Sequence, residues 1–118
     1  MIKKIKFGVI GCSNIAKKSV LPAILSSKNA EISIIGSRSK KKSESFSKIF
    51  SCKKFGTYDD VVNSKEIDAV YISLPVGLQK EWIIKSAKLG KHVLCEKSST
   101  DSFESAKEII SICKKNSV

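Results

Sequence analysis

The chain has 118 residues, with 22 Lys or Arg against 11 Asp or Glu, which gives a formal net charge of +11 at pH 7. This length predicts one domain with a sizeable core and is short for a two-domain enzyme. The charge would suit nucleic acid, but the lysines are scattered among serines without an aromatic and basic platform, so nucleic-acid binding is not expected.

The pattern of apolar residues alternates between strand and helix along the whole chain. Strands are predicted over residues 6–12, 30–37, 54–56, 68–74 and 92–95. Helices are predicted over residues 14–27, 40–51, 59–63, 78–89 and 102–115. The continuous apolar run 70–74 implies a strand buried on both faces, and therefore a parallel sheet with helices on each side. The sequence predicts an α/β fold with a doubly wound, Rossmann-like parallel sheet in a single domain over residues 1–118.

Two of the predicted helices carry local signals. Pro22 lies inside the first helix and should kink or interrupt it after Ser19 or Val20. At the start of the last helix, Asp101 with Glu104 three residues later resembles a capping box. The apolar side chains of this helix fall on one face, which holds Phe103, Ala106, Ile110 and Cys113.

A turn with one glycine joins the first predicted strand to the first predicted helix. In a dinucleotide site of this kind, one glycine permits the tight turn, a second lets the backbone approach the pyrophosphate, and a third position packs helix on strand. Gly11, Ser13 and Ala16 fill these roles, and a helix starting near Asn14 directs its N–H groups at the phosphates. The residues predicted to contact the dinucleotide here are Gly11, Cys12, Ser13, Asn14 and Ile15.

The end of the second predicted strand indicates which dinucleotide is preferred. An acidic residue at this point would bind the adenosine ribose hydroxyl of NAD, but Ser37 and Arg38 stand there. A guanidinium beside a hydroxyl suits a 2′-phosphate, and the lysines at 40–42 add positive potential. NADP is therefore the expected cofactor, and NAD is possible. The alternative that Arg38 and these lysines form only a solvated loop stays open, because exposed charge runs are common.

Two later segments also follow predicted strands. In open α/β sheets, ligands lie at the carboxyl ends of the strands, where the strand order reverses. Leu74 and Pro75 follow the fourth strand, and Glu96 and Lys97 follow the fifth, so all four are candidates for contact with the cofactor. A lysine at such a strand end, beside an acid, could hold or protonate a substrate oxygen. The alternative is an ordinary surface pair before a helix.

Cysteine and histidine placement gives no sign of a metal site. The four cysteines, Cys12, Cys52, Cys95 and Cys113, form no Cys-x-x-Cys pair, and His92 is the single histidine. Three of the cysteines occupy positions typical of buried residues. The N-terminal segment lacks the pattern of a signal peptide, and no apolar run approaches the roughly twenty residues of a membrane helix. We expect a cytoplasmic protein with no membrane partner.

Five motifs share their order and spacing with a known family. They are Gly8–Ala16, Ser37–Ser39, Phe55–Val62, Ile67–Pro75 and Gly90–Lys97. Together they cover nearly the whole chain and resemble the nucleotide-binding domain of the Gfo/Idh/MocA oxidoreductases, the glucose-fructose oxidoreductase and inositol dehydrogenase group. The resemblance implies that Lys97 lies near the nicotinamide and the reacting hydroxyl or carbonyl of a sugar or cyclitol. Lys97 is therefore the catalytic candidate.

Four positions depart from the usual pattern of that family. Ser13 replaces the second glycine, Val76 an asparagine, Gln79 a histidine and Ser98 a proline. The last three lie at the expected nicotinamide end, so they bear on substrate and turnover more than on the fold. Ser13 is small enough for the backbone to approach phosphate, although it lacks the φ freedom of glycine.

The resemblance implies an NADP-binding domain of an oxidoreductase that transfers hydride between a nicotinamide and a sugar, nucleotide sugar or cyclitol. Family members follow this domain with a substrate domain that is absent from this chain, so the chain alone is not expected to turn over a sugar-like substrate. In the full-length context a homo-oligomer is possible. We favour an excised N-terminal domain over a short, complete protein, and the alternative function is a stand-alone dinucleotide-binding module that senses or regulates.

Overall fold

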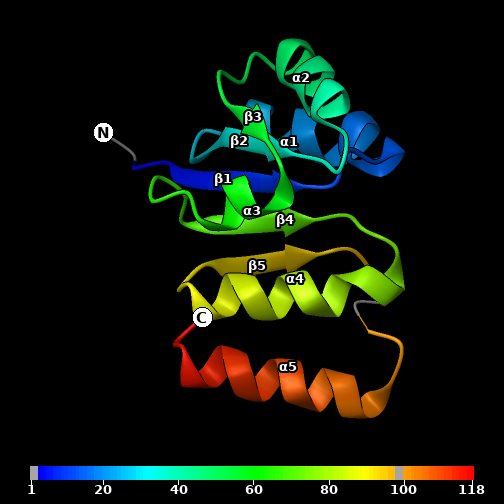
Figure 1. Cartoon of the computed structure of the whole chain (residues 1–118). Helices are drawn as coiled ribbons and strands as arrows, with labels where there is room; N and C mark the ends of the chain where they lie inside the picture. The colour runs from blue at the N-terminus through cyan, green and yellow to red at the C-terminus, as the bar shows by residue number, and fades with distance from the viewer. Residues whose placement is uncertain (1–2, 98–99) are drawn as a thin grey trace.

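The computed structural model describes residues 3–97 and 100–118, which adopt the predicted doubly wound α/β fold. In this part of the chain, a five-stranded sheet has the order β3-β2-β1-β4-β5, and every neighbouring pair is parallel. The strands are β1 (Ile5–Ile10), β2 (Ala30–Gly36), β3 (Phe55–Gly56), β4 (Ala69–Ile72) and β5 (His92–Cys95). The chain adds β2 and then β3 on one side of β1, and afterwards adds β4 and β5 on the other side (Figure 1). The strand order therefore reverses between β1 and β4.

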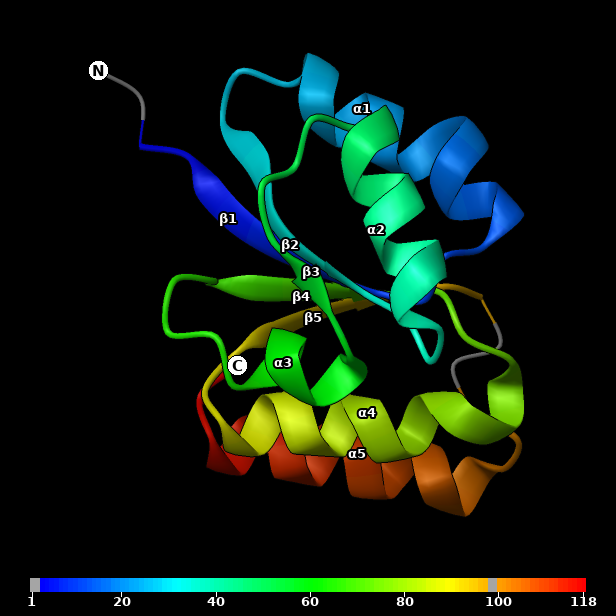
Figure 2. The same cartoon turned by 45° about the horizontal axis from the view of Figure 1, so that its top comes forward.

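Helices cover both faces of the sheet. They are η1 (Ala16–Val20), a π-helical segment, followed by α1 (Leu21–Ser26), α2 (Lys40–Ile49), α3 (Tyr58–Val62), α4 (Val76–Lys88) and α5 (Phe103–Lys115). Figure 2 shows α1 and α2 on one face and α3, α4 and α5 on the other. This arrangement explains the continuous apolar strands, since a strand between two helical layers buries both of its faces.

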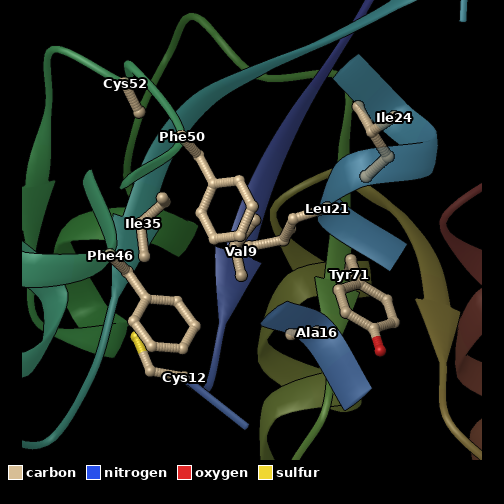
Figure 3. Close-up of a cluster of buried hydrophobic side chains, with 10 residues drawn as sticks. All are labelled: Val9, Cys12, Ala16, Leu21, Ile24, Ile35, Phe46, Phe50, Cys52 and Tyr71. Carbon is tan, nitrogen blue, oxygen red and sulfur yellow. The ribbon is translucent and has the colours of Figure 1, made fainter. Parts of the chain in front are cut away.

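Successive strand residues divide the apolar interior between the two faces. Val9 and Tyr71 pack with side chains of α1 and α2, in the cluster that Figure 3 shows. Their neighbours Ile10 and Ile72 pack in a second cluster with side chains of α3 and α4. All four side chains are essentially inaccessible to solvent. Full burial of one such apolar side chain contributes about 1.5–3 kcal/mol, so the central strands β1 and β4 anchor both layers.

The first helix changes its hydrogen bonding at the predicted place. The chain is helical from Asn14, but within η1 the N–H of Leu21 donates to the carbonyl of Ala16, five residues earlier. The α-helical pattern resumes with α1, where Pro22 is the second residue and has no N–H to donate. The predicted interruption after Val20 is confirmed as a change from π-helical to α-helical hydrogen bonding. The helix itself continues through this point.

The strands end earlier than the sequence predicts. The prediction of strand over residues 6–12 and 68–74 is wrong at the carboxyl ends, because β1 stops at Ile10 and β4 at Ile72. At Gly11 the backbone takes φ +103°, which turns the chain out of the sheet. Residues 73–75 likewise form a short loop before α4. Both loops lie at the carboxyl edge of the sheet.

The last helix differs from its prediction in its cap and its buried face. It begins at Phe103, and its N-cap is Ser102, whose side chain accepts a hydrogen bond from the N–H of Ser105, so the expected role of Asp101 is wrong. Phe103 and Ile110 are 73% and 56% exposed. Ile109 instead packs against the cluster under α4. Ala106 and Cys113 are partly buried as the predicted face requires, so the covered side of the helix coincides with that face only in part.

Two cysteines, Cys12 and Cys52, are buried, whereas Cys95 and Cys113 are partly exposed, so the expectation of three buried cysteines is wrong. Cys95 lies on the edge strand β5 and Cys113 on the outer helix α5, where less of the protein covers a side chain. Among the described residues, no three His, Cys, Asp or Glu side chains gather where they could hold a metal ion. No helix in residues 3–97 and 100–118 has the length and hydrophobicity needed to cross a membrane.

Candidate functional site

Two neighbouring clefts open at the carboxyl edge of the sheet, beside the point where the strand order reverses. The first has a volume of ≈ 260 Å³ and lies between the turn after β1 and the start of α2. The second has a volume of ≈ 500 Å³ and lies between the start of α4 and the end of β5. Ser73 and Leu74, which follow β4, line both clefts. This is the place where open α/β sheets bind ligands.

The turn after β1 requires glycine at its first position. Gly11 has φ +103°, which L side chains rarely adopt. A Cβ atom on Gly11 would lie 2.8 Å from the carbonyl oxygen of Ser73 and 2.9 Å from Cδ2 of Leu74. The loops after β1 and β4 are therefore in close contact, and Gly11 also lines the first cleft.

Ser13 ties this turn to the loop after β4. Its Oγ donates a hydrogen bond to Oγ of Ser73 (2.8 Å) and accepts one from the N–H of Ala16 (3.1 Å). Ser73 Oγ in turn donates to the carbonyl of Gly11 (3.2 Å). The serine thus serves as a cap for the helix that follows. The N–H groups of the first helical turn at Asn14 and Ile15 still have no intrahelical partner, and such groups favour an anion.

The opposite wall of the first cleft is a short turn between β2 and α2. Ser37 Oγ accepts a hydrogen bond from the N–H of Ser39 (3.2 Å), and Ser39 Oγ accepts one from the N–H of Lys42 (3.3 Å). These bonds fix the backbone on both sides of Arg38, whose side chain is exposed and lines the cleft together with Lys42.

The first turn of α2 carries positive side chains at the helix end that is itself partially positive. The first turn of α2 holds the lysines at 40–42 and no acidic residue. Cations near a helix N-terminus are unfavourable, because that end carries positive partial charge. The lysines, Arg38 and the helix end therefore concentrate positive potential beside the first cleft, which an anionic group placed there would neutralise.

Neutral side chains form the rest of the first cleft. Cys12 points its sulfur toward the carbonyl of Gly36, and burial raises the pKa of its thiol to about 11 despite the nearby charge of Lys42. Tyr58, the first residue of α3, packs edge-on against Trp82 with ring centroids 5.1 Å apart. Burial raises the pKa of the Tyr58 phenol. Both groups are therefore uncharged near neutral pH and do not offset the positive charge of the cleft.

The second cleft combines an apolar wall with four polar side chains. The wall is formed by Ile15, Leu74 and Val76, and the polar groups come from Ser73, Gln79, Glu96 and Lys97. The hydroxyl of Tyr71 donates a hydrogen bond to Oε2 of Glu96 (2.5 Å).

This bond fixes the Glu96 carboxylate next to Lys97. Burial, followed by the bond to Glu96, raises the pKa of the Tyr71 phenol, which therefore remains a donor at neutral pH. Glu96 is partly buried and Lys97 is exposed, so the carboxylate stands inside the cleft and the lysine at its mouth.

Most of the residues predicted for the site come together at these clefts. The first cleft is lined by Gly11, Cys12, Ser13, Ser37, Arg38, Leu74 and Pro75. The second is lined by Ile15, Leu74, Glu96 and Lys97. Asn14 is exposed in the first helical turn and lines neither cleft.

Sequence reasoning missed Ser39, Tyr58 and Ser73 as lining residues. Ser73 had a usable signal, since it follows a fully buried strand that was expected at the carboxyl edge. Ser39 could have been found as the residue before the second helix, where serine is a preferred cap. Tyr58 carries no local signal, because it reaches the cleft only through the packing of α3 against the sheet.

A comparison with known protein families identifies the family of the chain. A family described as "Oxidoreductase family, NAD-binding Rossmann fold", the Gfo/Idh/MocA group, matches residues 5–118. The chain belongs to this oxidoreductase family. The resemblance inferred from the five motifs is therefore confirmed, since all five lie within the matched residues.

Relatives within the family act on sugars or nucleotide sugars. The dTDP-3,4-didehydro-2,6-dideoxy-α-D-glucose 3-reductase of Streptomyces violaceoruber is 37% identical over 99 residues, which are 84% of this chain and 29% of that protein. The D-xylose 1-dehydrogenase (NADP⁺) 2 of Haloferax volcanii is 34% identical over 108 residues, which are 91% of this chain and 33% of that protein. The chain thus spans about a third of the length of the curated relatives it matches.

A solved structure of the family superposes closely on the chain. It is a 3-ketoreductase from Actinomadura kijaniata in complex with TDP-benzene and NADP, with a TM-score of 0.95 and 32% identity. The match covers 98% of this chain and 37% of the ketoreductase chain.

The structure shows where three of the four residues that depart from the family pattern lie. Ser13 uses its side chain to cap the first helix, which glycine could not do. Val76 and Gln79 both line the second cleft, close to Glu96 and Lys97. Ser98, which stands where the family usually has proline, lies outside the described residues.

Proposed function

We propose that this chain is the NADP-binding part of an oxidoreductase that transfers hydride between the cofactor and a carbonyl or hydroxyl of a sugar or nucleotide sugar. The observation that carries the proposal is the basic turn around Arg38, which faces the glycine-containing turn at 11–15 across one cleft. An excess of positive charge at this position favours a 2′-phosphate over a ribose hydroxyl.

The residues of both clefts fit an extended dinucleotide. The adenosine end would occupy the first cleft, with its 2′-phosphate at Arg38 and Lys42. The diphosphate would lie over residues 11–15, where the N–H groups of Asn14 and Ile15 have no intrahelical partner. The nicotinamide would occupy the second cleft, between its apolar wall and Glu96.

The chemistry proposed for the second cleft divides between the cofactor and the protein. When bound, the nicotinamide supplies the hydride donor or acceptor, and the protein orients it. Ile15, Leu74 and Val76 exclude water from the ring. Lys97, at the mouth of the cleft, donates a hydrogen bond to the substrate oxygen and delivers or removes its proton as the carbonyl and hydroxyl interconvert. Glu96 is held in place by Tyr71.

The substrate class is proposed from the relatives. A nucleotide-sugar 3-reductase and a sugar 1-dehydrogenase each match more than four fifths of this chain. Because the chain spans only about a third of those proteins, we propose that the remaining contacts to the sugar come from a further domain. The 118 residues alone would then bind NADPH but turn over little substrate.

Calorimetric titration of the chain with NADPH and NADH tests the proposal. We expect NADPH to bind more tightly. Arg38→Ala should weaken NADPH by about 1.5–3 kcal/mol, or roughly ten- to a hundredfold, because it removes a charge-assisted hydrogen bond. The same substitution should leave NADH nearly unchanged.

Lys41→Ala is a matched control, since Lys41 belongs to the same basic turn but does not line the cleft. It removes one positive charge without removing a contact, so its effect on NADPH should be much smaller than that of Arg38→Ala. Equal losses of affinity for NADPH and NADH in Arg38→Ala, or no binding of either dinucleotide to the unmodified chain, would contradict the proposal.

A further inference from the structure

A buried carbonyl oxygen in the second cleft has no hydrogen-bond partner. Gln79 is only 1% exposed, and its Oε1 meets no donor among the described residues. A buried acceptor that is left unpaired loses its hydration without compensation, so native proteins rarely retain one. The oxygen therefore points to a donor that lies outside the described residues, and a ligand bound in the cleft would supply one.

Three nearby polar side chains of the described residues make hydrogen bonds to other groups. Glu96 is an acceptor and already receives the hydroxyl of Tyr71. The hydroxyl of Ser73 donates to the carbonyl of Gly11, and the hydroxyl of Ser13 donates to Ser73. Lys97 is the remaining donor among the described residues that line this cleft, and it makes no hydrogen bond to Oε1, so a ligand in the cleft is the candidate partner.

We propose that Oε1 of Gln79 accepts a hydrogen bond from the carboxamide amino group of the nicotinamide ring. The inference rests on the proposed function, in which the ring occupies the second cleft. The carboxamide is the only N–H donor on that ring, and the ring itself suits the apolar wall of Ile15, Leu74 and Val76.

The burial of Gln79 indicates whether the cofactor or the substrate supplies the donor to its oxygen. Lys97, which would meet the substrate oxygen, is exposed, whereas Gln79 is almost fully enclosed. We assign the enclosed position to the cofactor ring, because the substrate oxygen would meet the exposed Lys97. Gln79 therefore fixes which way the carboxamide points, and with it which face of the ring is turned toward Lys97.

The test compares NADP⁺ with its 3-acetylpyridine analogue, in which a methyl group replaces the amino group and the carbonyl is kept. The unmodified chain should bind NADP⁺ about five- to tenfold more tightly than the analogue, as expected for one neutral hydrogen bond. Gln79→Met has a similar volume but no acceptor and should bind both compounds alike. Val76→Ala trims the same cleft without touching a polar group, so it should weaken both compounds and keep their ratio.

A third compound, 2′-phospho-ADP-ribose, separates this inference from the proposed function. It lacks the nicotinamide and should bind the unmodified chain and Gln79→Met equally. If the unmodified chain binds this compound and NADP⁺ but does not distinguish NADP⁺ from the analogue, the role of Gln79 is refuted and the proposed function stands. If Gln79→Met keeps the preference for NADP⁺, the role of Gln79 is likewise refuted. If none of the three compounds binds, the proposed function fails as well.

Discussion

Gly11→Ala probes the turn on which the proposed phosphate site depends. A residue other than glycine in the left-handed region costs about 1–2 kcal/mol, and Gly11 lies there with φ +103°. The new methyl group would also lie 2.8 Å from the carbonyl oxygen of Ser73, a backbone atom that cannot rotate away. Ser73 is itself held, since its N–H donates to the carbonyl of Ile10 (3.0 Å). Adding roughly 1–3 kcal/mol for overpacking, the free energy of unfolding should fall by about 2–5 kcal/mol.

Urea unfolding followed by circular dichroism measures this change, and two other glycines provide controls. Gly90 has φ +77° with open space around its Cβ position, so Gly90→Ala should cost only the left-handed penalty of about 1–2 kcal/mol. Gly77 lies in α4 with ordinary φ and open space, so Gly77→Ala should stabilise the chain by up to about 0.5–1 kcal/mol. If Gly11→Ala were no less stable than Gly90→Ala, the steric part of the reasoning would be refuted.

Two further predictions concern bonds between side chains. Tyr71→Phe removes the donor to Glu96 and should lower the free energy of unfolding by about 1.5–3 kcal/mol. A double-mutant cycle with Glu96→Gln measures the coupling between the two side chains. If the two losses of unfolding free energy simply add in the double variant, the bond contributes nothing. In the capping box of α3, the N–H of Thr57 bonds to Asp60 and lowers the pKa of that carboxyl. The stabilisation is therefore complete above the unfolded pKa of about 3.9 and is lost as the pH falls through the lower folded value. Asp60→Asn should flatten the fall in stability below about pH 4, and an unchanged acid limb would count against the bond.

Much of the fold could be predicted because its signals are local. Continuous apolar strands alternate with helices, and this order alone indicates a parallel sheet covered on both faces. The ends of the strands could not be placed in the same way. Gly11 and Cys12 continue the apolar pattern of β1, and only the backbone conformation at Gly11 shows that the sheet has already ended. The covered face of α5 was predicted only in part, at Ala106 and Cys113, since its packing partner and not its own apolar pattern decides which side is covered.

In the candidate site, too, features within one short segment could be predicted, whereas contacts between distant residues could not. The turn at 11–15 and the Ser37–Arg38 pair were predictable, because each is a short motif at the end of a strand. The bond between Tyr71 and Glu96 joins residues 25 positions apart, which meet only because β4 and β5 are neighbours. The unpaired oxygen of Gln79 is a property of its enclosure, which no sequence pattern reveals. The catalytic role of Lys97 stays a prediction.

The division of the interior into two clusters has a consequence for heat resistance. Cys12 belongs to the cluster under α1 and α2, whereas Leu74 belongs to the cluster on the other side of the sheet, and both line the first cleft. A dinucleotide lying along the carboxyl edge would therefore touch both packed layers at once and join them. At a hundred times its dissociation constant, such a ligand adds about 2.7 kcal/mol to the folded state. The melting temperature of the chain would then follow the supply of its cofactor.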